Sequence, residues 1–129
     1  MILIACVDDR NGLQFHGRRL SRDRVVTARI LERAGGRLWA APPSAVLFPA
    51  GTVIAEAQFL TRAGAADACF VETDAQPDPA QIAQVILYRW GRAYPADVHF
   101  HLPEGMRLVS STVFAGFSHP AVTEEVYTR

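Results

Sequence analysis

One carboxylate in the N-terminal part of the chain has apolar neighbours at helical spacing. Asp23 is followed by Val26 and Ile30, and in a helix these three side chains would share one face. An acid on an apolar face loses hydration, which raises its pKa and suits it to donate a proton or to bind the amidine-like edge of a ligand. An acid in the first turn of a helix is also stabilised by the helix dipole, without any chemistry. Asp23 is therefore the leading candidate for a catalytic residue, and helix stabilisation is the alternative.

Other charged residues lie close to Asp23 in the sequence. Asp8, Asp9 and Arg10 follow an apolar run, at the edge where parallel sheets place ligands, although ordinary turn chemistry also explains them. The Asn11-Gly12 pair is a turn signal. A local basic cluster follows, which suits contact with an anion or simply the solvated start of a helix. This cluster comprises Arg18, Arg19, Arg22 and Arg24.

The four histidines form no recognisable metal-binding motif. His99 and His101 alternate on a predicted strand, so both side chains could face one side. Zinc requires a third and a fourth ligand, and neither Cys-x-x-Cys nor His-Glu-x-x-His occurs in the chain. A P-loop, Gly-x-Gly-x-x-Gly and a Gly-x-Ser-x-Gly elbow are also absent. We expect packing or surface roles for the histidines and no bound metal.

Alternating strands and helices must position these residues. Continuous apolar runs predict strands buried on both faces at Ile2–Val7, Ala68–Val71 and Val85–Trp90. Ser21 is the predicted N-cap of a helix that runs to Ala34 and is stopped by Gly35-Gly36.

Shorter elements complete the pattern. We expect short strands at Arg37–Ala41 and Thr52–Ala55, helical segments at Ser44–Phe48, Glu56–Ala63 and Ala80–Ala83, and late strands at Val98–His101, Met106–Phe114 and Glu124–Thr128. Strands separated by helices favour parallel connections, whereas successive strands at the end favour an antiparallel hairpin. The predicted fold is α/β, a mixed sheet flanked by helices.

Composition sets the broad class of protein. The chain has 129 residues, of which 50% are hydrophobic and 20% charged, as expected for one globular domain. Its 13 basic residues balance its 13 acidic ones, so no bulk charge favours nucleic acid or a membrane surface. Met1-Ile-Leu-Ile lacks the features of a signal peptide, and Cys6 and Cys69 lie within apolar runs. Free buried thiols and a cytoplasmic location are the expectation.

The order of the segments resembles the dihydrofolate reductase family. The opening MILIACVDDRNG is similar to that family's first strand and the start of its active-site loop, and LSRDRVV is similar to the start of the helix with its substrate-binding acid. ACFVE and QVILYRW resemble two late parallel strands, and DVHFHLPEGMRLVSSTVF with EEVYTR resembles the terminal hairpin. The resemblance covers most of the chain. It implies a single dihydrofolate reductase-like domain, 1–129, whose mixed sheet is mostly parallel with a C-terminal antiparallel hairpin.

The resemblance also assigns roles to individual residues. It implies that Asp23 is the catalytic, substrate-binding acid, and that Gly12 and Leu13 make weak cofactor contacts. The implied substrate-binding residues are Ala5, Cys6, Val7, Leu20, Val26 and Thr27. Short bacterial proteins that carry a ribonuclease Z label are also similar to this chain. True metallo-β-lactamase nucleases require His-x-His-x-Asp-His, and the sequence after His99-Phe-His101 does not provide it.

Several family features are missing. The pterin-stacking aromatic corresponds to Thr27, and the tryptophan before the acid corresponds to Arg18. The glycine pair that lets the backbone approach the cofactor diphosphate is replaced by Glu72-Thr73-Asp74, whose carboxylates would repel that group. Ala40–Ser44 holds no arginine for a 2′-phosphate.

Two hypotheses follow. The chain is a divergent, non-catalytic relative with a degraded cofactor site, which would suit a homodimer, or it is a small NADPH-dependent reductase of a pterin or related heterocycle. We favour the first and expect weak NADPH binding or none. Neither hypothesis involves nucleic acid or a membrane.

Overall fold

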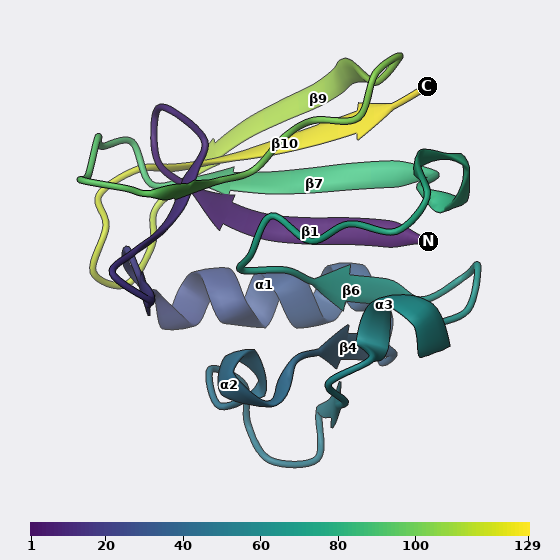
Figure 1. Ribbon diagram of the computed structural model, residues 1–129. Coiled ribbons are helices and arrows are strands. Elements are labelled where there is room, and N and C mark those ends of the chain that lie inside the picture. Colours follow the sequence, from purple (N-terminus) through teal and green to yellow (C-terminus); the bar gives the residue numbers. More distant parts are fainter.

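The continuous apolar run near the start of the chain forms the central strand of a seven-stranded sheet (Figure 1) in the computed structural model, which describes residues 1–129. This strand, β1 (Ile2–Val7), lies between β6 (Ala68–Phe70) and β7 (Gln84–Arg89) and is parallel to both. Ile2 is in register with Ala68 on one side and with Gln84 on the other. The prediction of three neighbouring, mutually parallel buried strands is confirmed.

The sheet continues in both directions from this centre. Its strand order is β5-β4-β6-β1-β7-β10-β9, with β4 (Leu38–Ala40) and β5 (Val53–Ala55) parallel to β6. On the other side β10 (Val122–Thr128) pairs antiparallel with both β7 and β9 (Arg107–Phe114). The sheet is therefore mixed and mostly parallel, with a C-terminal antiparallel hairpin at one edge.

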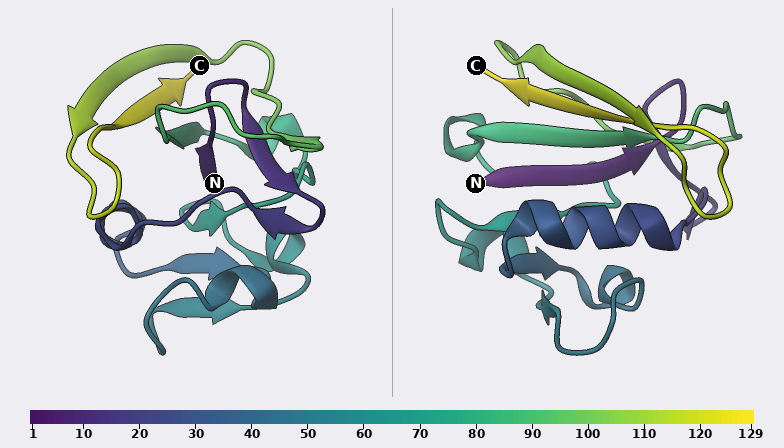
Figure 2. Two further views of the ribbon diagram at one scale, coloured as in Figure 1. Left: turned by 90° about the vertical axis from the view of Figure 1, so that its left-hand side faces the viewer. Right: turned by 180° about the vertical axis from the view of Figure 1, so that it is seen from behind.

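Helices lie on both faces of the sheet. The longest, α1 (Arg24–Ala34), lies along one face, and the short α3 (Phe59–Arg62) lies on the other (Figure 2). α2 (Pro42–Ala45) follows β4, and a 3₁₀ turn, η1 (Pro79–Gln81), precedes β7. Successive side chains of a strand point to opposite faces, so the sheet separates two apolar cores. One core packs β1 and β7 against Val26 and Ile30 of α1, as the helical spacing predicts.

The first helix begins later than the sequence predicts. Its N-cap is Asp23, not Ser21, because the backbone of Asp23 is extended (φ −156°, ψ 129°) and its carboxylate accepts from the N–H groups of Val25 and Val26. Asp and Ser are about equally good N-caps, so the local sequence does not decide between them. The C-terminal end is as predicted: Gly35 has φ 61°, a left-handed conformation that glycine adopts without strain.

The segment after β1 is more regular than a loop. β2 (Gly12–Phe15) pairs antiparallel with β3 (Arg18–Arg19) and with β8 (Val98–His99), giving a separate three-stranded sheet. The prediction that Val98–His101 is a strand of the terminal hairpin is therefore wrong. The backbone N–H and C=O groups of this short strand are paired with those of β2. Which strand a short segment pairs with cannot be read from its local sequence.

The predicted helix Glu56–Ala63 is shorter in the structure. The N–H of Glu56 bonds to the carbonyl of Ala40 and so extends the pairing of β5 with β4, which leaves only Phe59–Arg62 helical. Ala63 has an extended backbone, so Gly64 is not needed as a left-handed cap. The remaining predicted strands and helical segments agree with the structure to within a few residues at their ends.

Both cysteines are free, as predicted. Cys69 is fully buried, and burial raises the pKa of its thiol to about 12, while burial also raises the pKa of the Cys6 thiol. No helix combines the length and the apolar character that crossing a bilayer would require.

Candidate functional site

Asp23 is held at the start of α1 by donors from its own helix and from one segment that is distant in the sequence. It is 3% exposed, and its Oδ1 accepts from the N–H of Val25 at 2.9 Å, of Val26 at 3.4 Å and of Phe117 at 2.9 Å. The first two bonds are ordinary N-cap bonds. The third comes from the connection between β9 and β10, so the carboxylate joins the start of α1 to the C-terminal hairpin.

The second oxygen of Asp23 is equally engaged. Oδ2 accepts from the N–H of Ser118 at 2.8 Å and from its hydroxyl at 3.2 Å, and it lies 2.9 Å from Nδ1 of His119. This close packing requires Gly116, since a Cβ at that position would lie 2.6 Å from Oδ2 of Asp23. Both carboxylate oxygens therefore have their hydrogen-bonding capacity filled by the protein.

These contacts reverse the expected protonation behaviour of Asp23. Burial raises the pKa of its carboxyl, but hydrogen bonds from the Phe117 amide, the His119 ring and the Ser118 amide outweigh it, and the pKa lies well below the usual range. The prediction of a raised pKa is therefore wrong. A carboxylate that stays ionised near neutral pH is not a proton donor, and its occupied oxygens leave little capacity for a ligand.

Three other carboxyl groups share this lowered pKa. The guanidinium of Arg37 is the main cause of the lowered pKa of Asp67. Burial raises the pKa of Asp8, but hydrogen bonds from backbone N–H groups outweigh it. Burial also raises the pKa of Glu124, and hydrogen bonds from Arg33 and Tyr88 outweigh it.

We expect acid to destabilise the protein for this reason. Each of the four groups has a folded-state pKa below its unfolded value of about 4, so its stabilising effect is present above that pH and is lost as the pH falls toward the folded-state value. Urea unfolding measured from pH 7 to pH 3 should show a nearly constant free energy of unfolding down to about pH 5 and a steep fall below pH 4. A free energy that is flat to pH 3 would contradict the bonding described for these carboxylates.

The imidazole of His119 lies between the side chains of Asp23 and Ser21. Nε2 of His119 lies 2.8 Å from Oγ of Ser21, and its ring stacks on Trp90 with centroids 4.6 Å apart. The imidazole is 7% exposed. Sequence reasoning does not find this histidine, since it lies 96 residues from Asp23 and no motif surrounds it.

The pocket between Asp23 and Cys6 is nearly closed. Its volume is only about 10 Å³, room for about one water molecule. Cys6, Val26 and Thr27 line it, as does Trp90. Asp23 thus lies beside Cys6 at the end of β1, where the space between them is filled by side chains. A second pocket, of about 440 Å³, also adjoins Asp23 but does not reach Cys6; it is lined by Arg22, Asp23, Arg24, Thr27, Val46, Leu47, Phe117 and Ser118.

The predicted binding residues do not form one surface. Ala5 and Val7 are fully buried in the core on the opposite face of the sheet from Cys6, because side chains alternate along β1. Leu13 is buried in that same core. Leu20 is half-buried and lines neither this pocket nor the cavities described next.

Gly12 has a structural role at the end of β1. Its N–H donates to Oδ1 of Asp8 at 2.7 Å, and a Cβ there would lie 2.7 Å from Cβ of Ala96. Asp8 also accepts from the N–H groups of Arg10 and Tyr94, so the polar turn after β1 organises the backbone around a buried carboxylate.

A large polar cavity opens next to the closed pocket. Its volume is about 760 Å³, within the usual range for small-molecule sites. It lies at the carboxyl edge of the parallel strands, since Ala41 follows β4 and Glu72 follows β6. Its polar lining residues are Gln14, Arg18, Arg19, Ser21, Arg22, Ser44, Glu72 and Thr73. Arg18 and Arg22 form no ion pair within the protein, whereas Ser44 is only 6% exposed.

Arg19 and Glu72 form an ion pair in the lining of this cavity. Nε and Nη2 of Arg19 donate to the two carboxylate oxygens of Glu72 at 2.9 and 3.0 Å, and Nη2 also donates to the carbonyl of Pro43 at 3.1 Å. This bidentate pair fixes Glu72 at the end of β6 and balances its charge. The glycine pair that would let the backbone approach a diphosphate is absent at this position.

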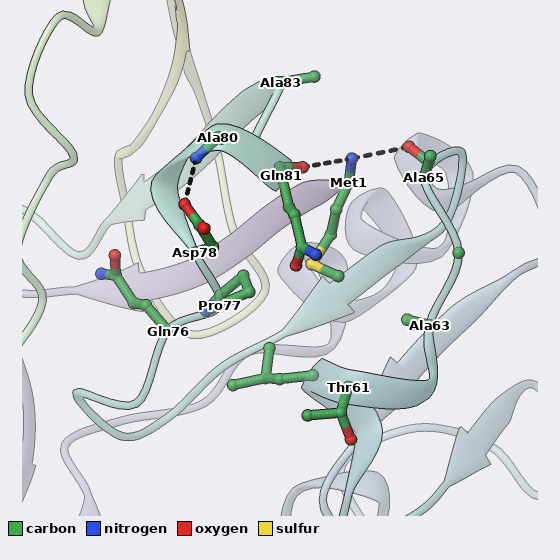
Figure 3. Close-up of a pocket in the computed structure, with 12 residues that line it drawn as sticks. Met1, Thr61, Ala63, Ala65, Gln76, Pro77, Asp78, Ala80, Gln81 and Ala83 are labelled. Atoms are coloured by element: carbon green, nitrogen blue, oxygen red, sulfur yellow. Dashed lines mark hydrogen bonds between the residues drawn. The ribbon is translucent and has the colours of Figure 1, made fainter.

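A second cavity of about 780 Å³ lies at the opposite, amino edge of the strands (Figure 3). The amino group of Met1 donates there to the carbonyls of Ala65 and Gln81, and Asp78 accepts from the N–H of Ala80 (Figure 3). Its ionisable groups are thus occupied by backbone bonds. It holds no nucleophile paired with a base, so the carboxyl-edge cavity is the candidate site. No group of three or more His, Cys, Asp or Glu side chains is arranged to hold a metal ion.

Comparisons with known proteins identify the fold. No protein-family model and no curated protein matches the chain. Among solved structures, dihydrofolate reductase from Enterococcus faecalis, complexed with NADP(H) and RAB-propyl, matches with a TM-score of 0.65 over 100% of this chain and 96% of that chain. The sequence identity is 10%. At that identity the match establishes a dihydrofolate reductase-like fold and nothing about activity.

Proposed function

We propose that this protein is a divergent dihydrofolate reductase-like protein with a degraded cofactor site, and that it binds a small anionic molecule in the cavity at the carboxyl edge. One contrast carries this proposal: the pocket between Asp23 and Cys6 has a volume of about 10 Å³, whereas the neighbouring basic cavity has about 760 Å³. Ligands usually bind at the carboxyl edge of α/β sheets, and an open cavity lies at that edge here. The cavity is lined by Arg18, Arg19 and Arg22 and not by Asp23.

The charges around the cavity support an anionic ligand. Glu72 is neutralised by Arg19, which leaves the positive charges of Arg18 and Arg22 on the cavity wall without partners. A carboxylate ligand would gain charge-assisted hydrogen bonds from these two guanidinium groups. A cytoplasmic location is part of this proposal, supported by the two free thiols.

The second candidate is a small NADPH-dependent reductase with Asp23 as its substrate-binding acid. The buried position of Asp23 beside Cys6 favours it. The filled pocket, the saturated carboxylate and the fixed Glu72 count against it. Whatever chemistry NADPH would supply, we expect the protein to bind it weakly or not at all.

Isothermal titration with citrate and with NADPH tests the proposal. We expect citrate to bind with a sub-millimolar Kd that weakens as salt is added, since the contacts are charged and exposed. Arg22→Ala should weaken citrate binding about tenfold, which corresponds to about 1.4 kcal/mol. The matched control is Arg107→Ala, because Arg107 is exposed on β9 and far from the cavity in the sheet order.

Two outcomes would overturn the proposal. Citrate affinity that is equal in wild type and Arg22→Ala would remove the cavity as an anion site. NADPH binding at micromolar Kd, about −8 kcal/mol, would be too tight to be incidental and would establish the reductase candidate instead.

A further inference from the structure

Three side chains form a hydrogen-bonded series at the edge of the cavity. Oγ of Ser21 lies 2.8 Å from Nε2 of His119, and Nδ1 of the same ring lies 2.9 Å from Oδ2 of Asp23. The distances are those of a nucleophile, a base and an orienting acid. The three residues come from the turn before α1 and from the connection between β9 and β10.

The protonation pattern of the series is set by Asp23. An ionised carboxylate accepts hydrogen bonds only, so Nδ1 of His119 must carry the proton that points at Oδ2. In the neutral ring Nε2 is then an acceptor, and the hydroxyl of Ser21 donates to it. This is the tautomer in which a histidine can take a proton from a serine.

The histidine ring is also held in place. It stacks on Trp90 at an interplanar angle of 28° and is only 7% exposed, so packing and its two hydrogen bonds restrain the ring. Gly116 lets the connecting segment approach Asp23 closely enough for the Nδ1 contact. Such orientation by packing is what a general base requires.

Ser21 forms part of the wall of the open cavity. It lines both the closed pocket beside Asp23 and the cavity of about 760 Å³. Arg18 and Arg22 line the same cavity, so positive charge lies where an anionic substrate would bind.

We propose that Ser21, His119 and Asp23 form a nucleophilic triad that hydrolyses small esters whose acyl part carries a negative charge. The proposal rests on the proposed function for the binding of the anionic group. Oγ of Ser21 forms a bond to the acyl carbon while its proton passes to Nε2 of His119. The bond to the leaving alkoxide breaks, and the imidazolium returns that proton to the leaving group. Water then forms a bond to the acyl carbon while its proton passes to Nε2. The bond between the acyl carbon and Oγ breaks, and the imidazolium returns the proton to Oγ, which restores Ser21 and releases the acid.

A serine-reactive probe and a pair of esters test the triad. Diisopropyl fluorophosphate should add its phosphoryl group to Ser21, as located by peptide mass spectrometry. The 4-nitrophenyl monoester of succinic acid should be hydrolysed with a higher kcat/KM than 4-nitrophenyl acetate. Ser21→Ala and His119→Gln should each lower kcat about 100-fold or more. The matched control Ser111→Ala, an exposed serine on β9, should retain full activity.

The outcomes separate this inference from the binding proposal. Labelling that spares Ser21, or hydrolysis that is equal in wild type and Ser21→Ala, would overturn the triad, and the mapping of the label on wild-type protein does not depend on any variant folding. Ser21→Ala should bind citrate with the wild-type affinity, whereas Arg22→Ala should bind it about tenfold more weakly. Loss of hydrolysis with citrate binding retained thus reports on the triad alone.

Discussion

The Asp23→Asn variant should be less stable than the wild type by about 3 kcal/mol. An asparagine has the size of an aspartate but offers one acceptor oxygen and an NH₂ group. The amide N–H of Ser118 and the ring of His119, which lie 2.8 and 2.9 Å from Oδ2, would face a donor instead of a charge. Losing charge-assisted bonds and leaving buried donors unpaired are among the few mechanisms that cost this much. Urea denaturation at pH 7 measures the loss.

Asp74→Asn is the matched control for this variant. Asp74 is exposed and forms no hydrogen bond or ion pair through its side chain, so its neutralisation should change the free energy of unfolding by less than about 0.5 kcal/mol. If Asp23→Asn were as stable as this control, the six contacts of the Asp23 carboxylate would contribute nothing to the fold.

Gly116→Ala should cost about 2 kcal/mol for a steric reason. The added Cβ would lie 2.6 Å from Oδ2 and 3.0 Å from Cγ of Asp23, and 3.1 Å from the carbonyl oxygen of His119. Contacts below 3 Å require movement, and both neighbours are buried and hydrogen-bonded. Because Asp23 must shift, the amide contacts of Phe117 and Ser118 should weaken at the same time. Denaturant unfolding checks the stability.

Gly51→Ala provides the comparison. Gly51 has φ 82° and nothing within 4 Å of an added Cβ, so this variant measures the strain of a left-handed backbone alone, about 1 kcal/mol. Equal losses for the two variants would mean that the segment at Gly116 moves away freely and does not hold Asp23 in place.

The strands of the main sheet could be predicted because their signal is local. Ile2–Val7 is apolar at every position, as a strand buried on both faces must be, and this property does not depend on what the strand pairs with. The C-terminal hairpin was predictable from the absence of helices between its strands. The burial of Val26 and Ile30 followed from helical spacing.

The chemistry of Asp23 could not be predicted in the same way. Apolar neighbours indicate loss of hydration, which raises a pKa, whereas the deciding contacts come from Phe117, Ser118 and His119. The sequence around Asp23 gives no indication of these contacts. The pairing of Ser21 with His119 could not be predicted for the same reason, because the two residues are far apart in the sequence and neither lies in a recognisable motif. The filling of the pocket depends on the position of Trp90, which only the packed structure gives.

The bonds between Asp23 and the segment before β10 also act as a non-covalent cross-link between the two ends of the fold. They close a loop of 96 residues, and contacts of such separation form late because the chain entropy must first be reduced by other contacts. A nascent or partly folded chain can therefore possess α1 and the central strands while Asp23 caps only its own helix. Ser21 then has no base beside it, so any reactivity of this serine is confined to molecules whose folding is complete.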